Sequence, residues 1–203
     1  GVLGCGLMGS GIAQVAAAAG YTTVVRDVSD AVMAKGKAGI AKSLDKFVEK
    51  GKLAAADRDA TLARLSYVTD VAALKDCDIV IEAVTEDLAL KNGLWQPLDA
   101  LCPAHTLFAS NTSSLTIAAM ASATARADRF VGLHFFNPVP LMQLVEVVRT
   151  VTTSMATFDR ALAFGKSLGK EAVAAKDNSG FIVNLLLVPY LLDAIRALEH
   201  GVA

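Results

Sequence analysis

Short apolar runs alternate with longer amphipathic segments along most of this chain. Runs rich in Val, Ile, Leu and Phe predict strands, and segments with apolar residues every three or four positions predict helices. Strands are expected at residues 2–3, 22–26, 78–84, 106–109, 130–134, 144–148 and 172–174. Helices are expected at residues 7–19, 31–50, 57–65, 88–101, 158–168 and 181–200. This alternation predicts an α/β fold with a mostly parallel sheet covered by helices.

Both ends of the pattern bear on domain organisation. Only Val2 and Leu3 form a strand-like run before the glycine loop that begins at Gly4, whereas a strand usually has about five residues, so we expect the native N-terminus to lie further upstream. Asp177-Asn178-Ser179-Gly180 forms a polar break, after which one apolar helix follows. We therefore predict one domain over residues 1–178 and the beginning of a second over residues 179–203.

A glycine-rich loop lies between the first predicted strand and the first predicted helix. Gly4-x-Gly6-x-x-Gly9 has the spacing of a dinucleotide-binding loop, in which the glycines permit a tight turn and a close approach to a pyrophosphate. Asp27 ends the next strand, where a carboxylate accepts from a ribose 2′-hydroxyl and repels a 2′-phosphate. The sequence thus predicts a Rossmann-type, doubly wound sheet that binds NAD rather than NADP. Alternation along the strand is expected to turn Arg26 away from Asp27 as a surface charge.

A histidine and a glutamate flank a proline-containing turn in the second half of the chain. His134 ends an apolar strand, and Asn137-Pro138-Val139-Pro140 leads to the strand that carries Glu146. A strand, a turn and a strand can bring an imidazole and a carboxylate together, as a histidine base requires. Taken alone, the pair could equally be a buried structural histidine and a charge at the edge of the sheet.

Composition limits the classes of partner. The 203 residues carry a formal net charge of −1 with 54% hydrophobic residues, so no overall charge favours nucleic acid or an anionic membrane surface. Cys5, Cys77 and Cys102 lack metal-ligand or disulfide spacing and are expected to be buried free thiols. The apolar run at residues 181–192 is too short for a membrane span. We expect no metal, no membrane and no nucleic acid, and a cytoplasmic or organellar location.

Four motifs resemble one enzyme family. They are Gly4-Cys5-Gly6-Leu7-Met8-Gly9-Ser10-Gly11-Ile12-Ala13-Gln14, Ser110-Asn111-Thr112-Ser113-Ser114, His134-Phe135-Phe136-Asn137-Pro138 and Asp177-x-x-Gly180-Phe181-Ile182-Val183-Asn184. In this order and over essentially the whole chain, they resemble the L-3-hydroxyacyl-CoA dehydrogenases. The block around His134 is far more specific than the glycine loop.

The resemblance implies roles for individual residues. His134 corresponds to the general base, Glu146 to its partner, Ser113 to the serine that bonds the reacting oxygen and Asn184 to an asparagine that holds the substrate. Contacts to NAD are implied for Gly4, Gly6, Leu7, Met8, Gly9, Asp27, Glu86, Lys91, Ser113 and Asn137. By themselves, Glu86 and Lys91 could be a helix N-terminal acid and a solvated lysine. Ser110, Asn111 and Ser114 could equally be turn-forming residues.

A lysine stripe on the second predicted helix offers a site for an anion. Lys35, Lys42, Lys46 and Lys50 fall on roughly one helical face. By resemblance, Ser43 and Lys50 correspond to CoA contacts. The alternative is an ordinary solvated face, balanced by nearby acidic residues.

The implied activity is the NAD-dependent oxidation of an (S)-3-hydroxyacyl-CoA to a 3-ketoacyl-CoA, in fatty-acid oxidation or short-chain acyl-CoA metabolism. The family continues through an all-α C-terminal domain, of which residues 179–203 would be the first helix, and forms homodimers. The rival hypotheses are a related dehydrogenase of small hydroxy or sugar acids and a non-catalytic dinucleotide-binding protein.

Overall fold

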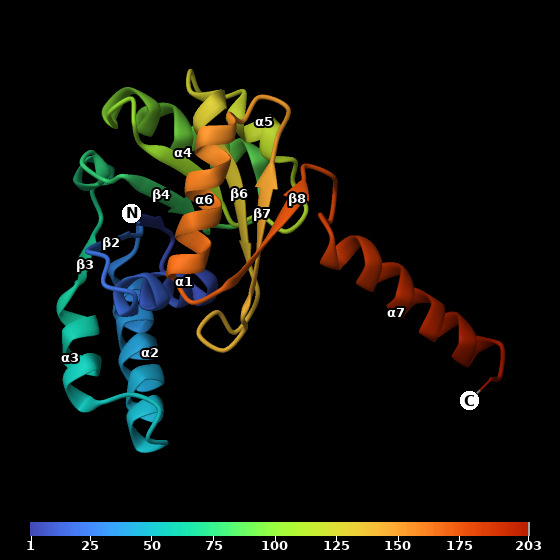
Figure 1. Cartoon of the computed structure of the whole chain (residues 1–203), viewed down its shortest axis with the longest axis horizontal. Helices are drawn as coiled ribbons and strands as arrows, with labels where there is room; N and C mark the ends of the chain where they lie inside the picture. The colour runs from blue at the N-terminus through green and yellow to red at the C-terminus, as the bar shows by residue number, and fades with distance from the viewer. Residues whose placement is uncertain (203) are drawn as a thin grey trace.

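A single eight-stranded sheet forms the centre of the computed structural model, which describes residues 1–202 (Figure 1). Its strands are β1 (Val2–Leu3), β2 (Thr23–Arg26), β3 (Leu65–Val68), β4 (Ile79–Glu82), β5 (Leu107–Ser110), β6 (Phe130–Phe135), β7 (Leu144–Arg149) and β8 (Glu171–Lys176). They lie in the order β3-β2-β1-β4-β5-β6-β7-β8. All neighbours pair in parallel except β6 and β7, which are antiparallel. The predicted doubly wound, mostly parallel sheet is confirmed.

The order of strands reverses between β1 and β4, which are neighbours in the sheet although distant in the sequence. At such a switch point the loops after adjacent strands run in opposite directions, and a crevice opens at the carboxyl ends of the strands. The glycine loop follows β1 there. The fold therefore places that loop where ligands of open α/β sheets bind.

Helices cover both faces of the sheet. They are α1 (Leu7–Ala18), α2 (Asp30–Glu49), α3 (Ala55–Ala63), α4 (Leu88–Leu101), α5 (Ile117–Ala121), α6 (Met155–Ser167) and α7 (Val183–Glu199), with 3₁₀ turns at Val71–Leu74 and Ala127–Arg129. Side chains of α1, α2 and α6 share one apolar cluster with Ile81 and Leu133 of the sheet. Those of α4 and α5 pack in a second cluster, in which Trp95 stacks on Phe108 at 4.9 Å between ring centroids.

The last helix, α7, extends away from the sheet (Figure 1). Its apolar side chains are largely exposed, as Leu186 and Tyr190 show at 68% and 70%. This separation from the body is consistent with the predicted boundary near residue 178, which stays a prediction.

One strand and one α-helix were not predicted. Residues 65–68 form β3 because they pair with β2 along its whole length, whereas the local pattern had suggested that the preceding helix continues to Leu65. The short helix α5 begins where the carboxylate of Asp177 accepts from the N–H groups of Ile117 and Ala118. Its capping residue is distant in the chain, so no local signal marks its start.

Candidate active site

His134 and Glu146 lie directly opposite each other in the antiparallel pair β6–β7. Nδ1 of the imidazole is 2.6 Å from Oε2 of the carboxylate. Both side chains are buried, with 3% and 1% of their surface exposed. The predicted meeting of these two residues is confirmed.

The second carboxylate oxygen of Glu146 is also occupied. Oε1 accepts from the N–H groups of Ile182 and Val183, at 3.0 and 2.9 Å, where α7 begins without a side-chain cap of its own. A carboxylate that accepts on both oxygens cannot donate, so His134 must carry its hydrogen on Nδ1. In the neutral imidazole, Nε2 is then a free base.

Ser113 lies at that free nitrogen. It follows β5, and its Oγ is 3.1 Å from Nε2 of His134; by the tautomer just derived, the hydroxyl donates and the imidazole accepts. The rings of Phe136 and Phe181 flank the imidazole, with centroids 4.5 and 5.5 Å away. Because little water lies between these rings and the imidazole, the electrostatic attraction between His134 and Glu146 is only weakly screened.

Glu86 holds the loop that carries Ser113. Its Oε1 accepts from the backbone N–H of Ser113 at 2.9 Å, from Ser114 at 3.3 Å and from the hydroxyl of Thr112. Burial alone would raise the pKa of Glu86, but the Thr112 hydrogen bond and the charge of Lys91 outweigh it and hold that pKa below its usual range. Glu86 therefore stays ionised, and its side chain remains 39% exposed toward solvent.

Lys91 is buried instead of solvated. Its Nζ contacts Oε1 of Glu82 at 2.5 Å, Oε2 of Glu86 at 3.3 Å and the carbonyl of Val84 at 3.3 Å. These acceptors match the three hydrogens of an ammonium group. Glu82, which is fully buried at the end of β4, is a functional candidate that sequence reasoning missed; its signal was a charge within an apolar strand.

The glycine loop has the shape that a dinucleotide requires. Gly4 adopts φ +94°, and a Cβ there would lie 2.7 Å from the carbonyl oxygen of Ala83, while a Cβ on Gly9 would lie 1.9 Å from the carbonyl oxygen of Gly4. A Cβ on Gly6 would meet open space. No side chain caps the N-terminus of α1 at Gly6 and no acidic residue occupies its first turn. Its free N–H groups can therefore donate hydrogen bonds to a phosphate.

Asp27 faces the same crevice. Its carboxylate accepts from the N–H of Cys5 at 2.8 Å and of Ser29 at 3.2 Å, which fixes its orientation. With Gly4 and Gly6 it borders a cavity of about 360 Å³. Arg26 borders this cavity too, and its Nε donates to the carbonyl of Thr69 at 2.9 Å. Arg26 is thus a surface charge that is also tied to the neighbouring loop, and its orientation away from Asp27 stays a prediction.

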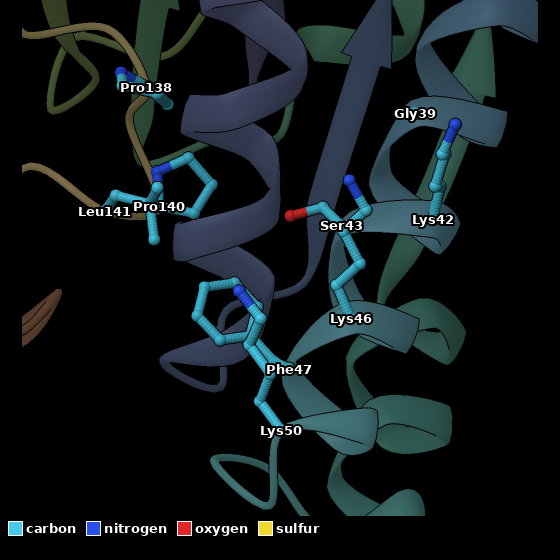
Figure 2. A pocket seen from close by; sticks show the side chains of 9 residues that line it. All are labelled: Gly39, Lys42, Ser43, Lys46, Phe47, Lys50, Pro138, Pro140 and Leu141. Carbon is cyan, nitrogen blue, oxygen red and sulfur yellow. The ribbon is translucent and has the colours of Figure 1, made fainter.

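A second cavity of about 360 Å³ lies between α2 and the turn that joins β6 to β7. In Figure 2 the hydroxyl of Ser43 points from α2 toward this turn, which contributes Pro138 and Pro140, whereas the side chain of Lys42 runs along α2. The residues that border it are Gly39, Lys42, Ser43, Lys46, Phe47, Lys50, Pro138, Pro140 and Leu141. Both residues implied as CoA contacts border this cavity, whereas Lys35 does not.

A smaller cavity of about 190 Å³ lies between α1, α2 and the turn that joins β6 to β7, and Leu7, Ser43 and Asn137 border it together. Met8 is half-buried and packs on the apolar cluster under α1. Asn184, also half-buried, lies on α7 next to Val183, whose N–H bonds Glu146. Leu7 and Asn137 thus border the same cavity, and Asn184 lies one residue after a backbone N–H that bonds the partner of the imidazole.

Gly36 is a further residue that sequence reasoning missed. A Cβ on this glycine of α2 would lie 2.4 Å from Sγ and 2.6 Å from the carbonyl oxygen of Cys5, in the glycine loop. The close packing of α2 on the glycine loop explains why this position is a glycine. The sequence around a glycine within a helix does not reveal such packing.

We expect Gly36→Ala to destabilise the protein by about 1–3 kcal/mol, as overpacking does, and to weaken dinucleotide binding because the loop must shift. Urea unfolding and calorimetric titration measure the two effects. Gly93→Ala is the matched control, since a Cβ on that exposed glycine of α4 meets nothing within 4 Å. Equal behaviour of the two variants would contradict the packing argument.

Comparison with known proteins places these features in context. Residues 1–178 match the family described as "3-hydroxyacyl-CoA dehydrogenase, NAD binding domain". The chain is 54% identical to the mitochondrial hydroxyacyl-coenzyme A dehydrogenase of Rattus norvegicus, over 98% of this chain and 66% of that protein. It is 47% identical to a 3-hydroxybutyryl-CoA dehydrogenase of Mycobacterium tuberculosis, over 100% of this chain and 72% of that protein. The crystal structure of an (S)-3-hydroxybutyryl-CoA dehydrogenase from Ralstonia eutropha superposes with a TM-score of 0.97 at 44% identity, over 100% of this chain and 71% of that one.

The chain thus spans less than two thirds of the length of the rat protein. Within residues 1–202, no helix has both the length and the apolar character that a membrane crossing requires.

Proposed function

The chain belongs to the 3-hydroxyacyl-CoA dehydrogenase family and contains its NAD-binding domain, and from this premise we propose that the protein oxidises (S)-3-hydroxyacyl-CoA to 3-ketoacyl-CoA with NAD. The observation that carries the proposal is the arrangement of His134 between Glu146 and Ser113, at 2.6 and 3.1 Å. It leaves one basic nitrogen beside one hydroxyl, as abstraction of an alcohol proton requires.

In the proposed mechanism, Nε2 of His134 accepts the proton of the 3-hydroxyl group. Glu146 keeps the hydrogen on Nδ1 and stabilises the imidazolium that forms. The Ser113 hydroxyl turns from the imidazole to the reacting oxygen, and Asn184 holds that oxygen from α7. NAD, when bound, supplies the hydride acceptor. In the reverse direction the imidazolium returns its proton to the oxygen.

The chain's own groups fit NAD at the crevice beside β1. The proposed contacts are Gly4, Gly6, Leu7, Met8 and Gly9 at the loop, Asp27 at the ribose, and Glu86, Ser113 and Asn137 toward the imidazole. The ammonium group of Lys91 is already occupied by Glu82, Glu86 and Val84, so we propose that Lys91 acts by holding Glu86 and not as a direct NAD contact. Oriented by two N–H groups, the Asp27 carboxylate retains lone pairs for a 2′-hydroxyl and would repel a 2′-phosphate. This supports a preference for NAD over NADP.

The cavity on α2 supports a CoA thioester as the substrate class. Lys42, Lys46 and Lys50 surround it with positive charge, and Phe47, Pro140 and Leu141 give it apolar walls. Phosphates of CoA suit the first set and the adenine the second. Ser43 and Lys50 are the proposed direct contacts.

Similarity to the family supports four further proposals. They are a short acyl chain, a homodimeric assembly, a cytoplasmic location and a role in fatty-acid oxidation.

The test is the reduction of acetoacetyl-CoA by the full-length protein, followed by the absorbance of NADH. We expect turnover with acetoacetyl-CoA and NADH, a much lower kcat/KM with free acetoacetate, which lacks CoA, and a much lower kcat/KM with NADPH. A sugar-acid substrate in the oxidative direction tests the rival dehydrogenase activity. Bound NAD without turnover of any of these substrates would contradict the proposal and favour a binding protein. Comparable kcat/KM with NADPH would reject the role of Asp27.

A further inference from the structure

Glu82 and Lys91 form a buried ion pair that does not include the reacting groups. Glu82 contacts Ser110 and Lys91 contacts Glu86, and these two side chains bond to the loop that carries Ser113. We propose that Glu82, through Lys91, is a positioning residue for Ser113, so that the loop after β5 is set by a charge at the end of β4. This inference rests on the proposed function of Ser113.

The position of Glu82 in the sheet supports this role. It ends β4 at the switch point, where its register partners are Leu3, just before the glycine loop, and Ser110, at the start of the Ser113 loop. One side chain here can connect the loops that follow two neighbouring strands. Glu82 is fully buried.

Both oxygens of this carboxylate accept hydrogen bonds. Oε1 accepts from Lys91 at 2.5 Å and from the N–H of Val84 at 2.7 Å, and Oε2 accepts from the hydroxyl of Ser110 at 2.6 Å. The Ser110 hydroxyl oxygen in turn accepts from the N–H of Thr112 at 3.2 Å. One route therefore runs from Glu82 through Ser110 to the residue before Ser113.

The second route runs through Lys91. Its Nζ is 3.3 Å from Oε2 of Glu86, and the other oxygen of Glu86 accepts from the N–H of Ser113 at 2.9 Å. All three ammonium hydrogens point to protein acceptors, so Lys91 acts on the site by holding Glu86. Glu86 by itself is a partly exposed side chain, which solvent would otherwise draw away from the loop.

Stability alone does not account for the pair. Taking two charges out of water costs free energy, and well-packed apolar residues usually stabilise a protein as well or better. A buried pair is best explained where it fixes a geometry, and here both ends of the pair fix the same loop.

The experiment uses Glu82→Gln and the double variant Glu82→Gln/Lys91→Met, which leaves no unpaired buried charge. In both we expect amide hydrogen exchange at Ser113 and Ser114 to be on the order of 10-fold faster without any added ligand. Exchange at Phe108 and Ala109, within β5, is expected to stay unchanged. We expect kcat to fall about 10- to 100-fold, as small displacements of reacting groups cause, with KM for the substrate little changed. Glu171→Gln, on the exposed edge strand β8, is the matched control.

A purely structural role predicts a different result. The double variant would then recover both slow exchange at Ser113 and the parental kcat along with its stability, and this outcome would overturn the proposal. If Glu82→Gln does not fold, the double variant decides alone. Faster exchange in a protein that never reduces acetoacetyl-CoA would reject the proposed function but keep the positioning role. Unchanged exchange in an active enzyme would reject the positioning role only.

Discussion

His134→Gln is expected to lower kcat by about 10²–10⁴-fold, the usual contribution of a general base. An amide has no basic nitrogen to accept the hydroxyl proton, whereas Nε2 of the neutral His134 tautomer carries no hydrogen and lies 3.1 Å from the Ser113 hydroxyl. KM is expected to change little, because the proton moves only in the transition state. Steady-state kinetics with acetoacetyl-CoA and NADH, in the full-length protein, measure both constants.

The matched control for this substitution is His105→Gln. His105 is exposed and lies near Asp78, at 3.4 Å, far along the chain from the buried pair. Both variants are expected to fold, because the glutamine can still donate to Glu146. A kcat for His134→Gln close to that of His105→Gln would remove His134 from the mechanism.

Glu146→Gln is expected to cause a loss of similar size, about 10²–10⁴-fold in kcat, because the wrong tautomer disables a histidine base. Both carboxylate oxygens accept: Oε2 from Nδ1 of His134, and Oε1 from the N–H groups of Ile182 and Val183. An amide offers one oxygen and one NH₂ group. If its oxygen faces α7, the NH₂ group faces Nδ1 and forces the hydrogen of the imidazole onto Nε2.

Hydrogen exchange at the start of α7 distinguishes this mechanism from simple misfolding. Glu146→Ala additionally frees the N–H groups of Ile182 and Val183, and we expect faster hydrogen exchange there than in Glu146→Gln. Glu171→Gln again serves as control. A kcat for Glu146→Gln close to that of Glu171→Gln would argue against the pairing of Glu146 with the base.

Glu146 also explains why the start of α7 is fixed although most of that helix leaves the body of the protein (Figure 1). Gly180 and Phe181 both have positive φ, at +79° and +48°. A left-handed phenylalanine is unfavourable, and its surroundings must hold it. Phe181 is buried against the imidazole, so the segment that carries Asn184 is held by the same two residues that form the base.

The sequence by itself determined the order of elements, because apolar periodicity follows from which side chains face the sheet. It determined the glycine loop with Asp27, since the spacing of glycines reports a backbone that side chains would obstruct. The pair of His134 and Glu146 was predictable because a turn rich in proline joins two short strands. Local pattern and turn chemistry sufficed for these features.

Tertiary structure alone decided the rest. Pairing with β2 made residues 65–68 a strand, and Asp177 began α5 from sixty residues away. Burial turned Lys91 from a solvated lysine into the partner of Glu82, and close packing on Cys5 gave Gly36 its meaning. Each depends on a neighbour distant in the chain, and a side chain's surroundings are fixed only when the whole sheet has formed.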